Sequence, residues 1–431
     1  MQAVRIGIAG LGTVGAGVVR LLAEQRDVLA LRSGRQLSVV AVSARDSKRD
    51  RGIDLAGVTW HDNPAALARD NNVDVVVELI GGSDGVARQV VETAIAAGKH
   101  VVTANKALLA HHGTALATAA EKAGVALGYE AAVAGGIPII KALREGLVGN
   151  RITRLYGILN GTCNYILSTM RESGRDFADV LAEAQAHGYA EADPSFDIDG
   201  VDAAHKLAIL TSVAFGCPVD FKGVHVEGIR NITALDIAYA AELGYRIKLL
   251  GLARQTKHGV EQRVHPCMVP LDAPIAHVEG VFNAVVAEGD FVGKTLFQGR
   301  GAGAGPTASA VVADLVDIAR GLRLPVFSVP VASLSRAGAA PMERHSGAYY
   351  VRLTVLDRPG VIAGVAAALR DEQVSMESML QRGRSNDPGA SVPVVLTTHV
   401  TEEAAMARAV ARIASLDTVV EKPCVIRVEQ L

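Results

Sequence analysis

The most constraining feature of the sequence is a glycine-rich turn that joins a strand to a helix at the N-terminus. Residues 4–9 form an apolar run that predicts a buried strand, and three glycines follow in a G-x-G-x-x-G spacing. The first permits a tight turn, the second lets a pyrophosphate approach the backbone, and the third lets helix and strand pack closely. A turn that serves only packing is the alternative, but the position between strand and helix favours a dinucleotide site. The residues expected around the phosphates are Gly10, Gly12, Thr13, Val14 and Gly15.

Strands and helices alternate through the first third of the chain, which predicts an α/β fold with a doubly wound, mostly parallel Rossmann-type sheet. After a strand that ends near Ser43, further strands are expected over residues 73–82, 99–109 and 124–133. Ligands bind such sheets at the carboxyl ends of the strands. Thr103 and Lys106 fall at one of these ends, so we expect both to border the cofactor, with Lys106 near its nicotinamide. A helix start disfavours a cation, which argues against a purely structural role for this lysine.

The residue that follows the second strand bears on the choice of cofactor. An acidic side chain here would hold the ribose 2′-hydroxyl of NAD, whereas this chain has Arg45. A guanidinium group suits a 2′-phosphate, so the sequence favours NADP over NAD. The alternative is that Arg45 only pairs with Asp46 at the surface.

The segment YEAAVAGGIPII contains a second unusual turn. Glu130 is expected to end a strand, Gly135 and Gly136 to form an irregular loop, and Pro138 to enter the first turn of a helix. One interpretation is an ordinary turn and cap. The other is an oxygen cage in which Glu130 and nearby carbonyl groups hold a hard cation of low charge. Residue spacing alone leaves both interpretations open.

Five carboxylates crowd into EADPSFDIDGVDAAHK, residues 191–206. A calcium loop of the EF-hand type is excluded, because alignment on Gly200 places Lys206 where the bidentate glutamate belongs. The next residues are apolar on nearly every face, which predicts a buried helix with Asp199 as its N-cap. Asp202 lies one turn before Lys206, and its carboxylate favours the charged form of the lysine. Lys206 can therefore protonate an oxygen that becomes negative. We therefore favour an ammonium-binding pocket with a catalytic lysine over a solvated acidic loop.

Composition and charge exclude several classes of protein. A length of 431 residues suggests about three domains, and a formal net charge of −2 provides no basic surface for nucleic acid or a membrane. The N-terminus begins with a strand pattern instead of a signal peptide. Four widely spaced cysteines argue against structural zinc and disulfide bonds. We expect a cytoplasmic protein with no nucleic-acid or membrane partner.

The end of the chain predicts a separate small domain. Residues 331–347 are rich in Ala, Ser, Gly and Pro, as in a linker, and residues 348–431 follow a βαββαβ order typical of a ferredoxin-like sheet. Gly360 precedes the first helix of this domain, whose free N–H groups suit a carboxylate ligand. The linker predicts that removal of residues 341–431 leaves the rest of the chain folded. A structural dimerisation lobe is the alternative interpretation.

Taken together, the motifs resemble those of one enzyme family. The glycine-rich start, TANK, YEAAVAGGIPII, ILNGTCNYIL, EADPSFDIDGVDAAHKLAIL and GRGAGAGPTASAVVADL occur in the order seen in homoserine dehydrogenase. The resemblance implies reversible interconversion of L-homoserine and L-aspartate 4-semialdehyde with NAD or NADP, in threonine, methionine and isoleucine biosynthesis. It also implies a dinucleotide-binding domain over residues 1–134, completed by a helix near 303–321, and an α+β substrate-binding and dimerisation domain over 135–302.

The same resemblance assigns roles to individual residues. Lys206 would be the acid/base lysine, and Lys106 would assist it beside the nicotinamide. The implied substrate-binding residues are Glu191 and Asp202 for the ammonium group and Gly161 and Thr162 for the α-carboxylate. The implied neighbours of the cofactor are Gly188 and Gly303. The implied ligands of a sodium ion are Glu130 and the carbonyl groups of Val133, Gly135 and Ile137.

The C-terminal segment LDRPGVI, together with the βαββαβ order, resembles the ACT domain, a small-molecule sensor common in amino-acid pathways. Similarity to monofunctional homoserine dehydrogenases that carry this domain implies L-threonine as an inhibitory effector. No kinase-like region precedes residue 1, so a fusion with aspartokinase is not expected. Because ACT sheets commonly pair side by side, we expect a homodimer or homotetramer.

Two other functions compete with this interpretation. An acylating semialdehyde dehydrogenase would need a thiolate nucleophile, for which Cys163 is the candidate. A dinucleotide-sensing regulatory protein would explain the glycine-rich turn and the C-terminal domain. A regulator, however, has no use for a lysine surrounded by acids, which makes it the weaker alternative.

Overall fold

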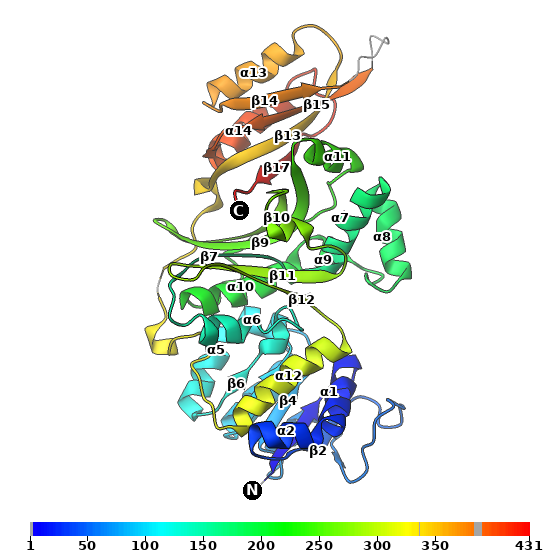
Figure 1. Cartoon of the computed structure of the whole chain (residues 1–431), viewed down its shortest axis with the longest axis vertical. Helices are drawn as coiled ribbons and strands as arrows, with labels where there is room; N and C mark the ends of the chain where they lie inside the picture. The colour runs from blue at the N-terminus through cyan, green and yellow to red at the C-terminus, as the bar shows by residue number, and fades with distance from the viewer. Residues whose placement is uncertain (1–2, 336, 383–389) are drawn as a thin grey trace.

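The computed structural model describes residues 3–335, 337–382 and 390–431. The molecule is elongated, with the N-terminal sheet at one end, a second sheet across the middle and the C-terminal segment at the other end (Figure 1). Within these described residues, no helix has the length and apolar character needed to cross a membrane.

The N-terminal sheet has six parallel strands in the order β3-β2-β1-β4-β5-β6. The strand order reverses beside β1, which is the point at which sheets of this kind bind ligands. The strands are β1 (Val4–Ala9), β2 (Leu37–Ser43), β3 (Thr59–Trp60), β4 (Val75–Glu78), β5 (His100–Thr103) and β6 (Leu127–Gly128). This architecture confirms the predicted fold class for the first third of the chain.

Helices cover both faces of this sheet because its strands are apolar on both sides. On one face, β-strand residues such as Ile6 and Val77 pack with Val18 and Leu315 of two helices. On the other face, Val76 and its neighbours pack with the helices that follow β4 and β5. The helices are α1 (Thr13–Glu24), α2 (Arg26–Ser33), α3 (Pro64–Arg69), α4 (Val86–Ala96), α5 (Lys106–Ala123) and α12 (Ala304–Ala319). Helix α12 comes from late in the sequence yet lies beside α1 (Figure 1).

Three expected strands are shorter than predicted. The strand expected over residues 73–82 is limited to β4, Val75–Glu78. The strand expected over residues 99–109 ends at Thr103, because Asn105 caps α5 by accepting a hydrogen bond from the Leu108 N–H. The strand expected over 124–133 is reduced to β6. Glu130 does not end a strand but begins a short 3₁₀ helix, Glu130–Ala132. Periodicity cannot separate a short buried strand from a buried helical turn, which explains these errors.

Among the described residues, a second, mixed sheet of eleven strands runs through the middle and C-terminal parts of the chain. Its middle strands are β7 (Ile152–Ile158), β8 (His225–Val226), β9 (Tyr245–Thr256), β10 (Gly259–Pro270), β11 (Phe282–Gly289) and β12 (Gly293–Arg300). One face is covered by helices that share a core with Leu155, Leu249 and Val264. The helices of this part are α6 (Ile139–Lys141), continued by a π turn over Ala142–Gly146, then α7 (Gly161–Ser173), α8 (Phe177–Ala186), α9 (Ser195–Ile198), α10 (Val201–Phe215) and α11 (Ala234–Glu242). Short 3₁₀ turns lie at Pro274–His277, Val331–Ser333 and Met342–Arg344.

The C-terminal part confirms the predicted βαββαβ order. Its strands pair in the order β17-β13-β15-β14, with the short β16 beside β13. The elements are β13 (Ser346–Leu356), α13 (Val361–Asp371), β14 (Met376–Gln381), β15 (Ser391–Thr398), β16 (Thr401–Glu402), α14 (Glu403–Ala414) and β17 (Cys424–Val428).

This C-terminal lobe is less independent than its linker suggests. Strand β17 pairs in parallel with β10, so the sheet continues from the middle of the molecule into the lobe. The linker itself is fixed to β10, since Val260 exchanges backbone hydrogen bonds with Gly338 and Ala340. Removal of residues 341–431 would therefore expose the edge of β10, and the expectation that the remainder stays folded loses its structural basis.

Candidate active site

Two lysines meet on one buried aspartate where α5 and α10 begin. The Nζ atom of Lys206 lies 2.7 Å from Oδ2 of Asp202, one helical turn away, and Nζ of Lys106 lies 3.1 Å from Oδ1 of the same carboxylate. The Asp202 side chain is 5% exposed, that of Lys206 11% and that of Lys106 34%. The i,i+4 pair was predicted from spacing, and its burial follows from the apolar character of α10, in which almost every residue is buried.

Asn160 holds this cluster in place. Its amide Nδ2 donates to Oδ2 of Asp202 at 2.8 Å and to Oδ1 of Asp197 at 2.7 Å. Its amide oxygen accepts from the backbone N–H of Cys163 and so caps α7. Asn160 is not among the site residues expected from the sequence, although its position between an apolar strand and an apolar helix is a typical N-cap signal.

A backbone carbonyl completes the surroundings of Lys206. The carbonyl oxygen of Leu159 accepts from Nζ of Lys206 at 2.7 Å and from the side-chain amide of Asn283 at 3.0 Å. Asn283 is buried, and a β-carbon at Gly301 would lie only 2.2 Å from it, so strand β11 and the segment after β12 are tightly packed here. Lys206 is therefore held by a carboxylate on its own helix and by the end of β7.

The charges of the cluster are set by the two ammonium groups. Burial opposes ionisation of Asp202, but Lys206 and Lys106 outweigh it and hold the pKa of Asp202 below its usual value. Burial and the nearby Asp202 carboxylate raise the pKa of Asp197, while its hydrogen bond from Asn160 opposes the rise. His205 lies on α10, like Asp202, and is buried against aromatic rings. Burial, with a smaller effect of His111, lowers the pKa of His205 to about 4. It is therefore neutral at pH 7.

The acidic segment differs from the prediction at the start of α10. The N-cap is Gly200, in the left-handed conformation with φ of 85°, and not Asp199. Asp199 instead pairs with Arg230. Phe196 of α9 lies under Lys106, whose Nζ is 5.7 Å from the ring centre.

The glycine-rich turn fits a dinucleotide. Gly10 has φ of 106°, and a β-carbon there would lie 2.6 Å from the Leu79 carbonyl oxygen. A β-carbon at Gly15 would lie 2.1 Å from the Gly10 carbonyl oxygen, whereas one at Gly12 would meet only open space. Helix α1 begins after Gly12 without a side-chain cap, so the N–H groups of its first turn, from Thr13 and Val14 onward, are available to phosphates.

The loops at the carboxyl ends of β4 and β5 are shaped by a buried carboxylate that the sequence analysis missed. Oε1 of Glu78 accepts from the N–H groups of Ile80 and Gly81. Oε2 accepts from the Thr103 hydroxyl at 2.7 Å, and Thr103 in turn accepts from the Asn105 N–H at 3.0 Å. Thr103 thus fixes the turn that leads directly to Lys106.

The residues expected to hold the substrate carboxylate lie at the start of α7. Gly161 is the first helical residue, and a β-carbon there would lie 2.8 Å from the Val281 carbonyl oxygen. The Thr162 hydroxyl donates to the Tyr189 carbonyl oxygen at 2.7 Å, which joins α7 to the turn that contains Gly188. Glu191 is exposed in that turn, and within the described residues no contact joins it to the lysine cluster. Gly303, with φ of 114°, is the N-cap of α12.

The Glu130 segment forms a cap, as one of the two interpretations predicts. The buried Glu130 carboxylate accepts from the N–H groups of Ile140 and Lys141, both at 2.9 Å. Burial, reinforced by Asp314, raises the pKa of Glu130 to about 7. The loop between Val133 and Ile137 turns at Ala134, where φ is 52°, and Gly135 packs against the Gly301 carbonyl. The cation cage stays a prediction.

Arg45 is exposed in the loop after β2. A second arginine, Arg51, reaches the glycine-rich turn: its Nε donates to the Leu11 carbonyl oxygen at 3.0 Å, and its guanidinium lies 5.6 Å from the Trp60 ring centre. Arg51, which is not among the residues expected from the sequence, fixes this loop beside the expected phosphate site.

Cys163 lacks the properties of a nucleophile. Its side chain is fully buried in α7, and its thiol donates to the Asp197 carbonyl oxygen at 3.2 Å. Burial, with the nearby carboxylates of Asp197 and Asp202, raises the pKa of this thiol well above its usual value. A protonated, buried thiol cannot serve the acylating mechanism.

A second cluster has the residue types of a metal site. Donor atoms of His265, Cys267 and Glu429 lie within 4.8 Å of one another, and all three residues are buried. A cation already occupies the cluster, because the Arg263 guanidinium donates to Glu429 and to Nε2 of His265. Burial raises the pKa of the Cys267 thiol well above its usual value and lowers that of His265 well below it. The arrangement is therefore an ion-pair network.

Comparisons with known proteins agree along the whole chain. Residues 138–316 match the homoserine dehydrogenase family model, residues 10–130 match the homoserine dehydrogenase NAD-binding domain, and residues 349–418 match the ACT domain. A homoserine dehydrogenase from Pseudomonas aeruginosa is 49% identical over 100% of both chains.

Solved structures lead to the same family. The structure of a homoserine dehydrogenase from Thiobacillus denitrificans aligns with a TM-score of 0.93 at 48% identity, over 100% of this chain and 98% of the other. A hyperthermophilic archaeal homoserine dehydrogenase in complex with NADPH aligns with a TM-score of 0.64 at 28% identity, over 75% of this chain and 99% of the other. On sequence, fold and site together, the chain belongs to the homoserine dehydrogenase family.

Proposed function

We propose that Lys206 moves the proton in the reaction of this enzyme, the reversible NAD(P)-dependent interconversion of L-homoserine and L-aspartate 4-semialdehyde. The observation that supports this role is the convergence of Lys206 and Lys106 on the buried Asp202 carboxylate. The ammonium groups of both lysines keep the buried Asp202 carboxylate ionised, and Lys206 places an N–H donor where an alkoxide develops.

In the reducing direction, a nicotinamide cofactor held at the glycine-rich turn would supply the hydride for the aldehyde carbon. The Lys206 ammonium group donates a proton to the carbonyl oxygen as negative charge develops there, and solvent later restores the proton. Lys106 contributes a second positive charge on the cofactor side of the cluster. Asp202 and the Leu159 carbonyl orient the Lys206 ammonium group, which leaves its third N–H for the substrate oxygen.

The substrate's own charged groups find partners around this cluster in our proposal. The N–H groups of Gly161 and Thr162 at the start of α7 would bind the α-carboxylate. Asp202 and Glu191 would bind the α-ammonium group. Because Glu191 is exposed and lies in a turn, its participation requires that this turn moves toward the substrate.

Arg45 is proposed to select NADP. It follows β2, at the place where the adenosine ribose of a bound dinucleotide lies, and its exposed guanidinium can reach a 2′-phosphate. Replacement of Arg45 by Ala should weaken NADPH binding by about 1.5–3 kcal/mol, typical of a hydrogen bond to a charged group, and leave NADH binding nearly unchanged. Fluorescence titrations with NADPH and with NADH measure the two affinities.

Arg49→Ala is the matched control for this prediction, because Arg49 is exposed in the same loop. Equal losses for NADPH and NADH in Arg45→Ala, or an equal loss of NADPH affinity in Arg49→Ala, would assign Arg45 a structural role only.

A monovalent cation, sodium, is proposed beside Glu130 with the carbonyl groups of Val133, Gly135 and Ile137. One carboxylate with neutral oxygens suits a hard ion of low charge. Folding raises the pKa of Glu130 to about 7, so the cation-free protein is stabilised by protonation of Glu130 below its ordinary pKa of 4.5 and loses this stabilisation as the pH rises through 7. A bound cation would offset that loss at high pH.

Exchange of sodium chloride for choline chloride at equal ionic strength should therefore lower the unfolding temperature at pH 8 and have little effect at pH 5.5. Sodium at a hundred times its Kd would contribute about 2.7 kcal/mol. In Glu130→Gln the difference between the two salts should vanish at both pH values. A difference that persists in Glu130→Gln would place the cation elsewhere.

L-threonine is proposed to bind the ACT domain, over residues 348–431, and to inhibit the enzyme. Helix α13 begins after Gly360, which has φ of 93° and provides no side-chain cap, so the helix start presents free N–H groups to an amino-acid carboxylate. Inhibition requires that threonine binds a less active arrangement more tightly, with a coupling of about 1–3 kcal/mol.

Saturating L-threonine should accordingly lower the apparent affinity for homoserine by roughly 5–150-fold, and calorimetry should detect its binding. D-threonine serves as the matched control, because the α-carbon that carries its ammonium and carboxylate groups has the opposite configuration. If L-threonine neither binds nor inhibits, the C-terminal lobe is structural.

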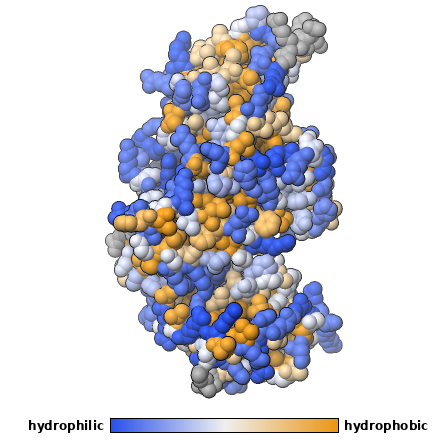
Figure 2. All heavy atoms as spheres, in the orientation of Figure 1, coloured by the Kyte–Doolittle hydropathy of each residue, from blue (hydrophilic) through white to orange (hydrophobic). Residues whose placement is uncertain are grey.

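A homodimer or homotetramer is proposed from the two ends of the eleven-stranded sheet. Strands β12 and β14 are its edges and carry exposed apolar residues, among them Leu296 and Met379. Phe291, in the turn before β12, is 89% exposed. Figure 2 shows apolar residues over the middle of the visible face and toward both ends, interleaved with hydrophilic ones. Edge strands and apolar patches of this kind favour association with another copy.

The four cysteines are buried and free, which supports a reducing cytoplasm.

A further inference from the structure

A short segment, residues 225–230, lies between the C-terminal lobe and the acidic segment of the active site. We call it the strut. It contains the two-residue strand β8, which pairs with β10, and the five residues from His225 to Ile229 make their backbone contacts with β10 and α9. None of the strut residues contacts Lys206 or Lys106 among the described side chains.

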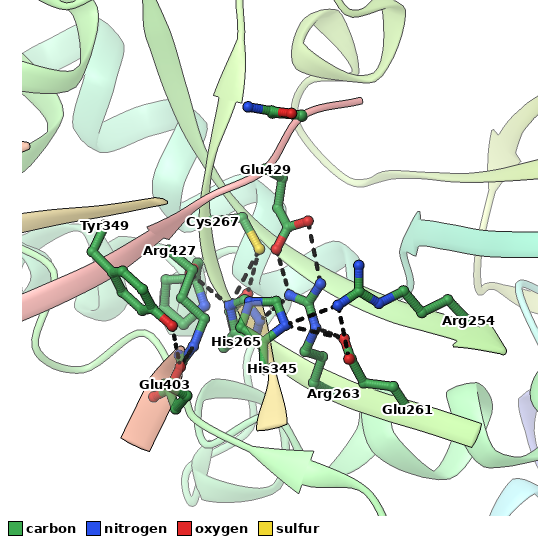
Figure 3. Close-up of polar contacts among 12 residues, drawn as sticks. Arg254, Glu261, Arg263, His265, Cys267, His345, Tyr349, Glu403, Arg427 and Glu429 are labelled. Carbon is green, nitrogen blue, oxygen red and sulfur yellow. Dashed lines mark hydrogen bonds and ion pairs between the residues drawn. The ribbon is translucent and has the colours of Figure 1, made fainter. Parts of the chain in front are cut away.

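One end of the strut is held by the C-terminal lobe. Arg427 of β17 donates to both carboxylate oxygens of Glu227, at 3.1 and 2.9 Å. The same guanidinium donates to Glu403, at the start of α14. The Glu403 carboxylate also accepts from the Tyr349 hydroxyl. Figure 3 shows Arg427 and Tyr349 both pointing to Glu403, beside the buried network around Arg263. Because Arg427 is 4% exposed, its position follows that of β17.

The other end of the strut is pressed against the acidic segment. A β-carbon at Gly228 would lie 2.2 Å from the Ile198 carbonyl oxygen and 2.5 Å from Cα of Asp199, so the two backbones are in direct contact. The Ile229 N–H donates to that same Ile198 carbonyl at 2.8 Å. The Arg230 guanidinium forms a two-point pair with Asp199 and donates to the Ser195 hydroxyl at 2.9 Å.

From the acidic segment the contacts lead into the active site. The carboxylate of Asp197 accepts from Asn160, the residue that also holds Asp202. Gly200 caps α10, and a β-carbon there would lie 3.1 Å from Val226 of the strut and 3.2 Å from Val264 of β10. A shift of the strut therefore moves the start of the helix that carries Asp202 and Lys206.

We propose that the strut is a positioning element for the substrate site: Gly228 and Arg230 set the place of the acidic segment, and Glu227 ties that place to β17 through Arg427. This inference rests on the proposed roles of Asp202 and Lys206. It makes Arg427, in the C-terminal lobe, a positioning residue for a reaction whose substrate it does not touch. It also gives the lobe a physical route to the active site that needs no change in the cofactor domain.

Gly228→Ala is the most direct test. The added methyl group must push the strut away from Ile198, whereas Gly149→Ala, the matched control, adds a methyl group at an exposed position with open space around it. Gly228→Ala should raise KM for homoserine roughly tenfold and lower kcat as well, because the start of the helix that carries Asp202 and Lys206 is displaced, and it should change the Kd of NADPH by less than about twofold. Gly149→Ala should leave all three constants unchanged.

Two milder variants keep the proposal testable if Gly228→Ala does not fold. Glu227→Gln removes the charge that Arg427 holds, and Arg230→Ala removes the exposed pair with Asp199, so each should raise KM for homoserine about two- to fivefold. Arg230→Lys should recover part of the affinity. In the double variant Glu227→Gln/Arg230→Ala, KM for homoserine should rise by less than the product of the two single increases, since both changes act on one element.

Unchanged KM in folded Gly228→Ala, Glu227→Gln and Arg230→Ala would overturn the proposal. So would a parallel rise in the Kd of NADPH, which would indicate general damage instead of a displaced substrate segment. The measurements are made without threonine, so they do not depend on the proposed effector. The proposed role of Lys206 is tested separately, by loss of turnover in Lys206→Ala.

Discussion

Lys206→Ala should lower kcat by about 10²–10⁴-fold, the range usual for a positioned acid or base, and leave the Kd of NADPH nearly unchanged. The variant removes the ammonium group that lies 2.7 Å from both Asp202 and the Leu159 carbonyl. Without it, the developing alkoxide loses the donor that Asp202 and the Leu159 carbonyl hold in place. Steady-state rates in both directions and fluorescence titration with NADPH provide the two quantities.

The variant should remain folded, because Asp202 keeps Lys106 and Asn160 as partners and is not left as an isolated buried charge. Lys222→Ala, at an exposed position in the same part of the chain, is the matched control and should retain full turnover. Near-normal turnover in Lys206→Ala would contradict the mechanism. A loss confined to NADPH affinity would assign the lysine to cofactor binding instead.

The parts of the site that the sequence predicted are those encoded by local spacing. The G-x-G-x-x-G turn and the strand before it follow from steric needs within a few residues, and β1 has the predicted bounds. The pair of Asp202 and Lys206 follows from the helical repeat of four residues. The burial of α10 follows from its apolar composition. Each of these inferences needed no knowledge of distant contacts.

The parts that the sequence did not predict depend on residues far apart in the chain. Lys106 and Asp202 are separated by almost a hundred residues, so local spacing cannot predict that they meet, and only the family resemblance assigns both to one site. The local sequence predicts Asn160 as a helix cap, yet its amide group also donates hydrogen bonds to two aspartates of the acidic segment. The linker composition suggested a detachable lobe, whereas pairing of β17 with β10 continues one sheet through it.

The network that joins the lobe to the rest of the molecule is fully buried. Arg263 of β10 donates to Glu429, just after β17, and to Oε1 of Glu261 at 2.6 Å. His345, at the end of the linker, lies 3.2 Å from the same Glu261 oxygen (Figure 3). Burial opposes ionisation of Glu429, but Arg263 outweighs it and lowers the pKa of Glu429. Arg263 and Glu429 are 166 residues apart in the chain, which is why no sequence pattern identifies the pair.

Glu429→Ala should destabilise the protein by about 3–5 kcal/mol, the cost of removing one partner of a buried ion pair. The Arg263 guanidinium, 2% exposed, would keep Glu261 but lose its partner from the C-terminal lobe. The free energy of unfolding in urea measures the loss. Arg408→Ala is the matched control, because its pair with Glu372 lies at the surface, where an ion pair contributes little to stability. The double variant Arg263→Met/Glu429→Leu should recover much of the stability, since an apolar pair leaves no buried charge unpaired. A loss in Glu429→Ala no larger than that in Arg408→Ala would mean that pairing of β17 with β10, and not this ion pair, holds the lobe in place.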